Sequence, residues 1–438
     1  MGRTSMRRRG GTFAICATAR ENTAMQQPQY THYDVIVIGG GPAGSATGTF
    51  LARRGYRVLI LEALRHPRHH IGESLLPAGM PVLAELGLDM RVMLQHHQAK
   101  YGARFFDPQS QRLETFAFGL PSDGIPPAFN VNREEFDTQL KHAAVTSGCE
   151  FLEETPVAQA EADRQPICIT LTDGTRITAD FLVDASGAAA KLTRQQGGVE
   201  TLPDFGRLAI YTYFSGVPAA HAEERSYLTM HLTEHGWIWL IPLPGDITSV
   251  GVVLKKTGLR SGLNPQQQFA AAVAESPTLA DRLKPLVALQ PYRACAGYSY
   301  RCRPLTCRYG LTVGDAGGFL DPIFSSGVFL ALMGATRGAQ AVAESLNGNT
   351  AEPLRQHGQY MAAGLGVFES FVRRFYQRDL VRNLFFSRHQ PAAMRTAVTS
   401  ILAGHVWDQT NPLVAAVGRS EGNSAADVWA ATPGAVAT

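Results

Sequence analysis

The feature that most constrains the fold of this chain is a cluster of glycines that directly follows a short apolar stretch. Residues 33–38 end in four consecutive β-branched residues, and Gly39, Gly41 and Gly44 follow at once. A small-residue segment then leads to a second apolar stretch that ends at Glu62. This order predicts a strand, a Gly-rich turn, a helix and a second strand, which is the dinucleotide-binding unit of an α/β fold.

Each residue of this turn has a separate steric or electrostatic role. Gly39 allows the tight turn, Gly41 lets the backbone approach a pyrophosphate, and Gly44 lets the helix pack on the strand. Ala43 lies where the helix N-terminus faces the phosphates. Glu62, at the end of the second strand, is placed to bind ribose hydroxyls. We therefore expect a nucleotide cofactor here, rather than glycines that serve only a structural turn.

Length and composition exclude several classes of protein. A chain of 438 residues with 45% apolar and 18% charged side chains should form roughly two to three folding units. Forty basic and 37 acidic residues nearly balance, which argues against a nucleic-acid partner. No apolar run reaches the roughly 18 residues of a membrane-spanning helix. The protein is therefore expected to be soluble and without a membrane span.

Cysteines and the N-terminus give weaker indications. Six scattered cysteines are typical of a reduced, cytoplasmic protein. Cys302 and Cys307 lack further metal-ligand neighbours, so no metal site is expected. The arginine-rich residues 1–30 are interpreted as an unstructured leader, or as sequence upstream of a natural start near Met25.

A second glycine and acid pair indicates which nucleotide binds. Gly314 and Asp315 end an apolar stretch, before a Gly-rich loop and a helix containing Val328. Residues 184–187 end another strand, and Arg133 opens a predicted helix. Here the chain resembles the FAD-dependent monooxygenase superfamily. The resemblance implies FAD, with Asp315 on its ribityl chain and Arg133 and Val328 beside the flavin. For Arg133, an ordinary first-turn helix residue is the alternative.

The resulting fold prediction is α/β: a Rossmann-type FAD-binding domain like that of p-hydroxybenzoate hydroxylase, an inserted β-sheet substrate domain and a helical C-terminal region. No second Gly-rich fingerprint follows a strand downstream, so we expect a separate flavin reductase to supply FADH2. The predicted division is 31–103, 129–200 and 292–345 for the FAD-binding domain, 104–128 and 201–291 for the substrate domain, and 346–438 for the helical region.

Two tryptophans narrow the chemistry. Trp237 and Trp239 stand two residues apart on a predicted strand, so both rings project from one face. Such a pair can simply fill a sheet core. The run 236–242, however, reproduces the W-x-W-x-I-P motif of flavin-dependent halogenases, and the chain resembles that family here. In the family these tryptophans lie near the flavin.

Residues 319–328, Phe-Leu-Asp-Pro-Ile-Phe-Ser-Ser-Gly-Val, resemble the F-x-x-P-x-x-S-x-G segment of the same family. The resemblance places Pro322 and Ser325 near the flavin and implies that the backbone amides of Ser326 and Gly327 hold a halide ion. Successive N–H groups at the start of a helix form a concavity for anions, so this role is physically reasonable. A plain flavin-contacting loop is the alternative.

Two further matches lie upstream. Residues 71–77, Ile-Gly-Glu-Ser-Leu-Leu-Pro, match a run found in halogenases of phenols and pyrroles. Lys100 stands in an Ala-Lys-Tyr-Gly-Ala segment that resembles the one carrying the family's essential lysine. Lys100 is therefore the catalytic candidate, and a solvated surface lysine is the alternative.

The sequence thus predicts an FADH2-dependent halogenase that uses O2 and chloride or bromide. Hypohalous acid relayed by Lys100 would halogenate an electron-rich phenol or pyrrole, either free or bound to a carrier protein. The tryptophan-specific branch has a glutamate where Phe324 stands. An FAD-dependent monooxygenase and a dehydrogenase or reductase of the same superfamily are the alternatives. The sequence does not identify the group that accepts the proton from the substrate; His231, Glu234 and His235, just before the tryptophan motif, are three possibilities.

Overall fold

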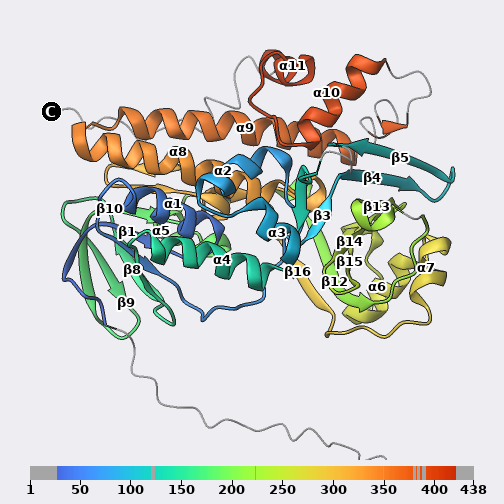
Figure 1. Ribbon diagram of the computed structural model, residues 1–438, viewed down its shortest axis with the longest axis horizontal. Helices are drawn as coiled ribbons and strands as arrows, with labels where there is room; N and C mark the ends of the chain where they lie inside the picture. Colours follow the sequence, from blue (N-terminus) through green and yellow to red (C-terminus); the bar gives the residue numbers. More distant parts are fainter. Residues whose placement is uncertain are drawn as a thin grey trace, which may run out of the picture.

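The computed structural model describes residues 27–119, 124–221, 223–348, 350–377, 381, 385–386 and 391–420. Of the predicted leader, only residues 27–30 are among them, and the end of the chain beyond residue 420 is not. Two large sheets stand side by side in Figure 1, and the long helices α8 and α9 run across both. No helix in the described ranges is long and apolar enough to cross a membrane.

The first sheet has a parallel centre. Its strand order is β18-β19-β10-β1-β2-β7, and β9 and β8 continue it from β10. All neighbours from β19 to β7 are parallel, whereas β18, β9 and β8 join in antiparallel fashion. The strands are β1 (His32–Ile38), β2 (Val58–Leu61), β7 (Glu150–Leu152), β8 (Val157–Glu161), β9 (Ile167–Leu171), β10 (Arg176–Asp184), β18 (Thr306–Cys307) and β19 (Gly310–Thr312).

The central strand β1 is apolar on both faces because both faces are covered. Val35 and Val37 belong to the core beneath the helices, whereas Ile36 and Ile38 belong to the core on the β8–β9 side. Parallel strands covered on both sides read as continuous apolar runs. The helices on this domain are α1 (Pro42–Ala52), α2 (Met80–Glu85), α3 (Met90–His96), α4 (Arg133–Thr146) and α5 (Lys191–Gln195).

The second sheet contains the tryptophan motif. Its order is β16-β12-β15-β14-β13-β4-β5, and every neighbouring pair is antiparallel except β13 and β4. A turn at residues 244–246 joins β14 to β15, with positive φ at Gly245 and Asp246. The strands are β4 (Gly102–Asp107), β5 (Arg112–Ala117), β12 (Arg207–Ser215), β13 (Leu228–Leu232), β14 (Gly236–Leu243), β15 (Ile247–Lys255) and β16 (Arg293–Ala296).

One segment differs from the division made from sequence. Residues 293–296, which that division assigned to the FAD-binding domain, form strand β16 and pair with β12 at the edge of the second sheet. The chain returns to the first sheet only after this edge strand. The remaining strands form two small sheets: β11 (Val199–Thr201), β17 (Tyr300–Cys302) and β20 (Gly318–Phe319), and β3 (Gln98–Lys100) with β6 (Ala128–Asn130).

The second sheet has two unlike faces. Ile238 and Leu240 face outward and pack against α6 (Pro265–Val273) and α7 (Pro277–Leu283). Trp237 and Trp239 face inward and join the core shared with the C-terminal helices. Those helices are α8 (Ser326–Gly348), α9 (Glu352–Tyr376), α10 (Ala392–Leu402) and α11 (Pro412–Ser420). An apolar stripe of α9, which includes Phe368 and Phe371, is buried in this core. The predicted α/β fold class is confirmed.

The space around two glycines of α9 predicts how substitutions there change the stability of the protein. A Cβ added at Gly364 would lie 2.2 Å from the Trp407 indole, whereas one added at Gly358 would meet nothing within 4 Å. We expect Gly364→Ala to lower the free energy of unfolding by about 1–3 kcal/mol through overpacking. Gly358→Ala on the same helix should raise it by up to about 1 kcal/mol, because alanine favours a helix. Urea denaturation of both variants measures this, and equal stabilities would contradict the packing of Trp407 on α9.

Candidate active site

The predicted cofactor residues gather at the carboxyl ends of the parallel strands. Gly39 follows β1, Glu62 follows β2 and Asp315 lies three residues beyond β19. Ligands of open α/β sheets bind at this edge, where strand order reverses around the first strand. The structure therefore brings together residues that are more than 250 positions apart in the sequence.

The glycines are required by close backbone contacts. Gly39 has a φ of 100°, and an added Cβ there would lie 2.3 Å from the Ala185 carbonyl oxygen. At Gly44 an added Cβ would lie 1.8 Å from the Gly39 carbonyl oxygen. The turn and the start of α1 can therefore approach each other only without side chains at these positions.

The helix that follows leaves an opening for a phosphate. Gly41 is the N-cap of α1 and supplies no side chain to the free N–H groups of the first turn, and Pro42 follows. An added Cβ at Gly41 would meet only the Arg68 guanidinium, at 3.3 Å. Uncapped N–H groups beside a guanidinium suit a diphosphate. The cradle fits FAD at this point.

Glu62 is buried, and its carboxylate is held by the turn itself. Its two oxygens accept hydrogen bonds from the Gly40 N–H at 2.8 Å and the Leu64 N–H at 2.9 Å. Arg68 approaches the same carboxylate at 3.6 Å. The acid is therefore at the expected edge, and these bonds orient it.

Arg133 is not an ordinary exposed residue of a first helical turn, because it is buried and joins two segments. It is buried at the start of α4 and forms two hydrogen bonds to Asp137, at 2.8 and 3.0 Å. Its remaining nitrogen donates to the carbonyl oxygens of Ile71 and Gly72 at 2.7 and 3.2 Å. Burial alone would raise the pKa of Asp137, but Arg133 and Arg68 hold it below its usual value. This network joins α4 to the Ile-Gly-Glu-Ser-Leu-Leu-Pro segment.

Asp315, Val328 and Ala43 lie around the same opening. An added Cβ at Gly314 would lie 2.9 Å from the Ala43 Cβ, and Gly72 lies next to both Arg133 and Val328. Burial raises the pKa of Asp315 to about 6, and the positive charge of Arg133 opposes this. A carboxylate in this position can accept hydrogen bonds from the hydroxyls of a ribityl chain.

Lys100 is not a solvated surface lysine. It ends β3, only 1% of its surface is exposed, and Nζ donates to the Leu75 carbonyl oxygen at 2.8 Å. Nζ also lies 5.3 Å from the centre of the Phe118 ring. Burial lowers the pKa of Lys100 to about 7. Burial therefore favours the neutral amine over the ammonium ion.

The tryptophans connect with the same segment. Trp239 Nε1 donates to the Ser249 hydroxyl at 3.2 Å, and the side chains of Ser249 and Tyr213 partly offset the raised pKa of the nearby Glu73 carboxyl group. Glu73 is 3% exposed, and burial raises its pKa to about 7. The sequence motif contained Glu73, but we assigned it no role. An acid within an otherwise apolar motif is a signal that could have identified it.

The proposed halide loop ends in a sharp change of backbone direction. Pro322 begins a short 3-10 turn, Ser325 has a left-handed conformation with φ of 54°, and α8 begins at Ser326. The N–H groups of Ser326 and Gly327 therefore fall in the first turn of a 23-residue helix, where no intrahelical acceptor exists. This arrangement can bind an anion.

The three proton-acceptor candidates named from sequence do not lie on the tryptophan face. His231 is paired in register with Ile238, which faces outward, and it bonds to Ser276 Oγ at 2.8 Å. Burial lowers its pKa to about 3. His235 pairs with Glu275 at 2.8 Å, and Glu234 is exposed. The alternation of strand residues turns His231 away from the tryptophan face, and Glu234 and His235 lie in the turn between β13 and β14.

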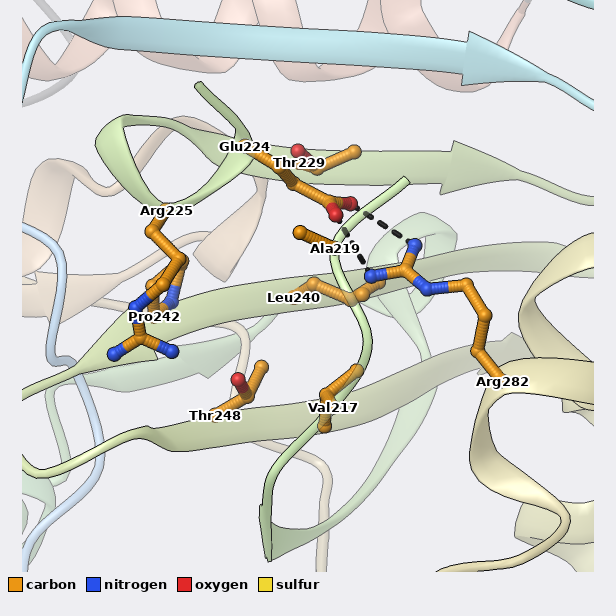
Figure 2. A pocket seen from close by; sticks show the side chains of 9 residues that line it. All are labelled: Val217, Ala219, Glu224, Arg225, Thr229, Leu240, Pro242, Thr248 and Arg282. Carbon is orange, nitrogen blue, oxygen red and sulfur yellow. Dashed lines mark hydrogen bonds and ion pairs between the residues drawn. The ribbon is translucent and has the colours of Figure 1, made fainter. Parts of the chain in front are cut away.

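A pocket does open on the outer face of the second sheet (Figure 2). Arg282 from α7 forms a two-pronged ion pair with Glu224 across it, at 2.9 and 2.8 Å. Leu240, which lines it, faces away from the tryptophans. The pocket encloses about 20 Å³, which holds little more than one water molecule. This pocket is too small for an aromatic substrate.

Comparison with known proteins agrees with this geometry. The FAD binding domain family matches residues 32–374. A 1H-pyrrole-2-carbonyl peptidyl-carrier-protein chlorinase of Pseudomonas fluorescens is 30% identical, covering 88% of this chain and 94% of its own length. A flavin-dependent brominase aligns with a TM-score of 0.79 at 27% identity, over 89% of this chain and 98% of its own. A flavoprotein/dehydrogenase from Cytophaga hutchinsonii aligns with a TM-score of 0.77 at 29% identity, over 89% of this chain and 100% of its own.

The predicted FAD-dependent oxidoreductase is thereby confirmed. A family match that spans both sheets, together with a halogenase relative covered almost end to end, shows that the chain belongs to the flavin-dependent halogenases of the FAD binding domain family.

Proposed function

We propose that this halogenase places chlorine or bromine on an electron-rich phenol or pyrrole, with Lys100 as the residue that handles the oxidised halogen. The burial of Lys100 carries the proposal. An isolated buried amine costs free energy, and burial alone accounts for its lowered pKa. Its Nζ bonds to a carbonyl of the segment that also contains Glu73. A buried lysine that bonds to the segment containing a second buried titratable group supports a catalytic role.

In the proposed reaction, each group at the site has a separate role. Bound reduced FAD, with O2, supplies the oxidant that converts halide to hypohalous acid. The Ser326 and Gly327 amides hold the halide, and Lys100 Nζ holds the acid by a hydrogen bond or captures its halogen. The ring exchanges one hydrogen for halogen and water is released, so atoms balance. Glu73, with a pKa raised to about 7, is our candidate acceptor for the ring proton.

The relatives and one residue, Phe324, support the proposed substrate class. The Pseudomonas fluorescens relative chlorinates a pyrrole carried on a peptidyl carrier protein. Phe324, buried against Phe371 and Phe375 of α9, leaves no acid at its position in the loop. We propose a phenolic or pyrrolic substrate, either free or on a carrier protein.

We further propose that a separate cytoplasmic flavin reductase supplies FADH2. The sequence has one Gly-rich dinucleotide turn, after β1, and none after a later strand. The likeness to the Cytophaga hutchinsonii flavoprotein/dehydrogenase supports a second candidate function, oxidation or reduction without halogen transfer. Neither that function nor a monooxygenase needs Lys100.

Product mass separates these functions. The protein would be incubated with FAD, a flavin reductase, NADH, O2, bromide and a panel of phenols and pyrroles, free and carrier-bound. We expect the paired isotope pattern of bromine in one product, and no product when the reductase is omitted. Hydroxylated product in place of brominated product would establish the monooxygenase alternative.

Glu62 should contribute to FAD affinity. Glu62→Gln keeps the size of the side chain but removes the charged acceptor, so the dissociation constant for FAD should rise roughly 5- to 150-fold, or about 1–3 kcal/mol. Glu150→Gln is the matched control, because Glu150 also accepts a backbone hydrogen bond, from Gln29, but lies on β7 away from the cradle. Flavin fluorescence titration measures both. Equal affinities would remove Glu62 from the site.

Lys100 should be required for halogenation but not for folding. Lys100→Met removes the amine and the cost of burying it, so this variant should be at least as stable as the parent protein and still bind FAD. It should make no halogenated product, and neither should Lys100→Arg, whose guanidinium cannot act as a nucleophile. Lys256→Ala, at an exposed position, is the control. Halogenated product from Lys100→Met within about twofold of the parent protein would show that halogen transfer does not need Lys100.

The pH dependence then distinguishes the two roles of Lys100. Since burial lowers its pKa to about 7, the amine is protonated below that pH and neutral above it. Capture of halogen by the amine predicts a yield that rises with pH through about 7, whereas hydrogen bonding by the ammonium predicts a yield that falls.

A further inference from the structure

A buried chain of hydrogen bonds joins the tryptophan motif to the proposed halide loop. Trp237 Nε1 donates to the Tyr376 hydroxyl oxygen at 2.9 Å, and the Tyr376 hydroxyl donates to Asp321 Oδ2 at 2.9 Å. The other oxygen of Asp321 accepts from the Ile323 N–H at 3.0 Å. An indole N–H can only donate, whereas a phenol can accept and donate at once. Tyr376 is therefore the group that can satisfy both neighbours.

These residues come from three separate parts of the fold. Trp237 lies on β14 of the second sheet, Asp321 lies between β20 and α8, and Tyr376 is the last residue of α9. The Arg207 guanidinium stacks 4.2 Å from the centre of the Tyr376 ring. Asp321 is 1% exposed. The end of a C-terminal helix thus reaches the junction of the two sheets.

Asp321 controls the shape of the loop. It caps the 3-10 turn that Pro322 begins, and Ser325 then adopts its left-handed conformation before α8 begins at Ser326. Only four residues separate Asp321 from the first proposed halide amide. A displacement of Asp321 must therefore change where the amides of Ser326 and Gly327 point.

Loss of the tyrosine hydroxyl would leave two buried groups without a partner. The Trp237 N–H and Asp321 Oδ2 both face this one oxygen. A buried polar group without a partner costs about 1–3 kcal/mol, so the loop and the strand would rearrange to recover bonds. The carboxyl group already bears a burial cost, as its pKa of about 7 indicates.

We propose that Tyr376 is a positioning residue for the halide site: through Asp321 it holds the loop that presents the Ser326 and Gly327 amides, and through Trp237 it fixes that loop against the tryptophan face. The inference rests on the proposed halide site. Tyr376 itself contacts neither the amides nor the glycine cradle by any bond among the described residues.

Bromide binding tests this without turnover. The FAD-loaded protein would be titrated with bromide while the flavin absorbance is recorded. We expect Tyr376→Phe to raise the bromide dissociation constant roughly 5- to 50-fold, the scale of one lost buried hydrogen bond. FAD affinity should stay within about twofold. In turnover, KM for bromide should rise by the same factor while kcat at saturating bromide changes less than about threefold.

Two further variants make the result decisive. Tyr360→Phe on the same helix is the matched control, because its ring stacks on Trp407 at 4.5 Å, away from the loop, and its bromide affinity should be unchanged. Asp321→Asn keeps the side-chain volume but weakens the acceptor, so it should also weaken bromide binding and decides the matter if Tyr376→Phe folds poorly. Unchanged bromide affinity in both Tyr376→Phe and Asp321→Asn would overturn the proposal, even with lower thermal stability.

The proposed halide site fails by a different result. If bromide leaves the flavin spectrum of the parent protein unchanged and no brominated product forms, the halide site is absent, and the role of Tyr376 is refuted with it. A parent protein that binds bromide, with variants that bind it equally well, refutes only the positioning role.

Discussion

The buried guanidinium of Arg133 is the interaction on which the rest of the site depends. It joins Asp137 on its own helix to the carbonyl oxygens of Ile71 and Gly72, and so fixes the segment that carries Glu73. Arg68 shares the Asp137 carboxylate and continues toward Glu62 in the glycine cradle. Breaking a buried ion pair by removing one partner typically costs about 3–5 kcal/mol, because the other charge is left alone. Arg133 and Arg68 therefore link the nucleotide edge to the segment that contains Glu73 through the shared Asp137 carboxylate.

Burial disfavours the charged form of both groups proposed to take part in the chemistry. It lowers the pKa of Lys100 to about 7 and raises that of Glu73 to about 7. An amine and an acid with such pKa values are suited to proton transfer near neutral pH. The second sheet and the C-terminal helices form the core that contains Trp237 and Trp239 together.

The parts of the fold with local signals were predictable. The turn requires glycine at positions 39 and 44, so the sequence alone predicts it. The paired tryptophans lie on one strand face, as their spacing indicates. His231 is close to Trp237 in sequence, but its register with Ile238 places it on the opposite face of the sheet. Glu73 and Asp321 were visible within motifs, but their burial was not. Tyr376, 55 residues from Asp321, had no local signal.

By itself, the sequence determined the dinucleotide turn, the order of the four halogenase motifs and the class of cofactor. These depend on short runs in which sterics and strand or helix period act between near neighbours. Tertiary structure alone decided that Lys100 is buried on the Leu75 carbonyl, that Arg133 links α4 to the segment before Glu73, and that β16 belongs to the second sheet. These outcomes depend on desolvation and on pairing between distant segments, and both arise only when the two sheets pack against the C-terminal helices.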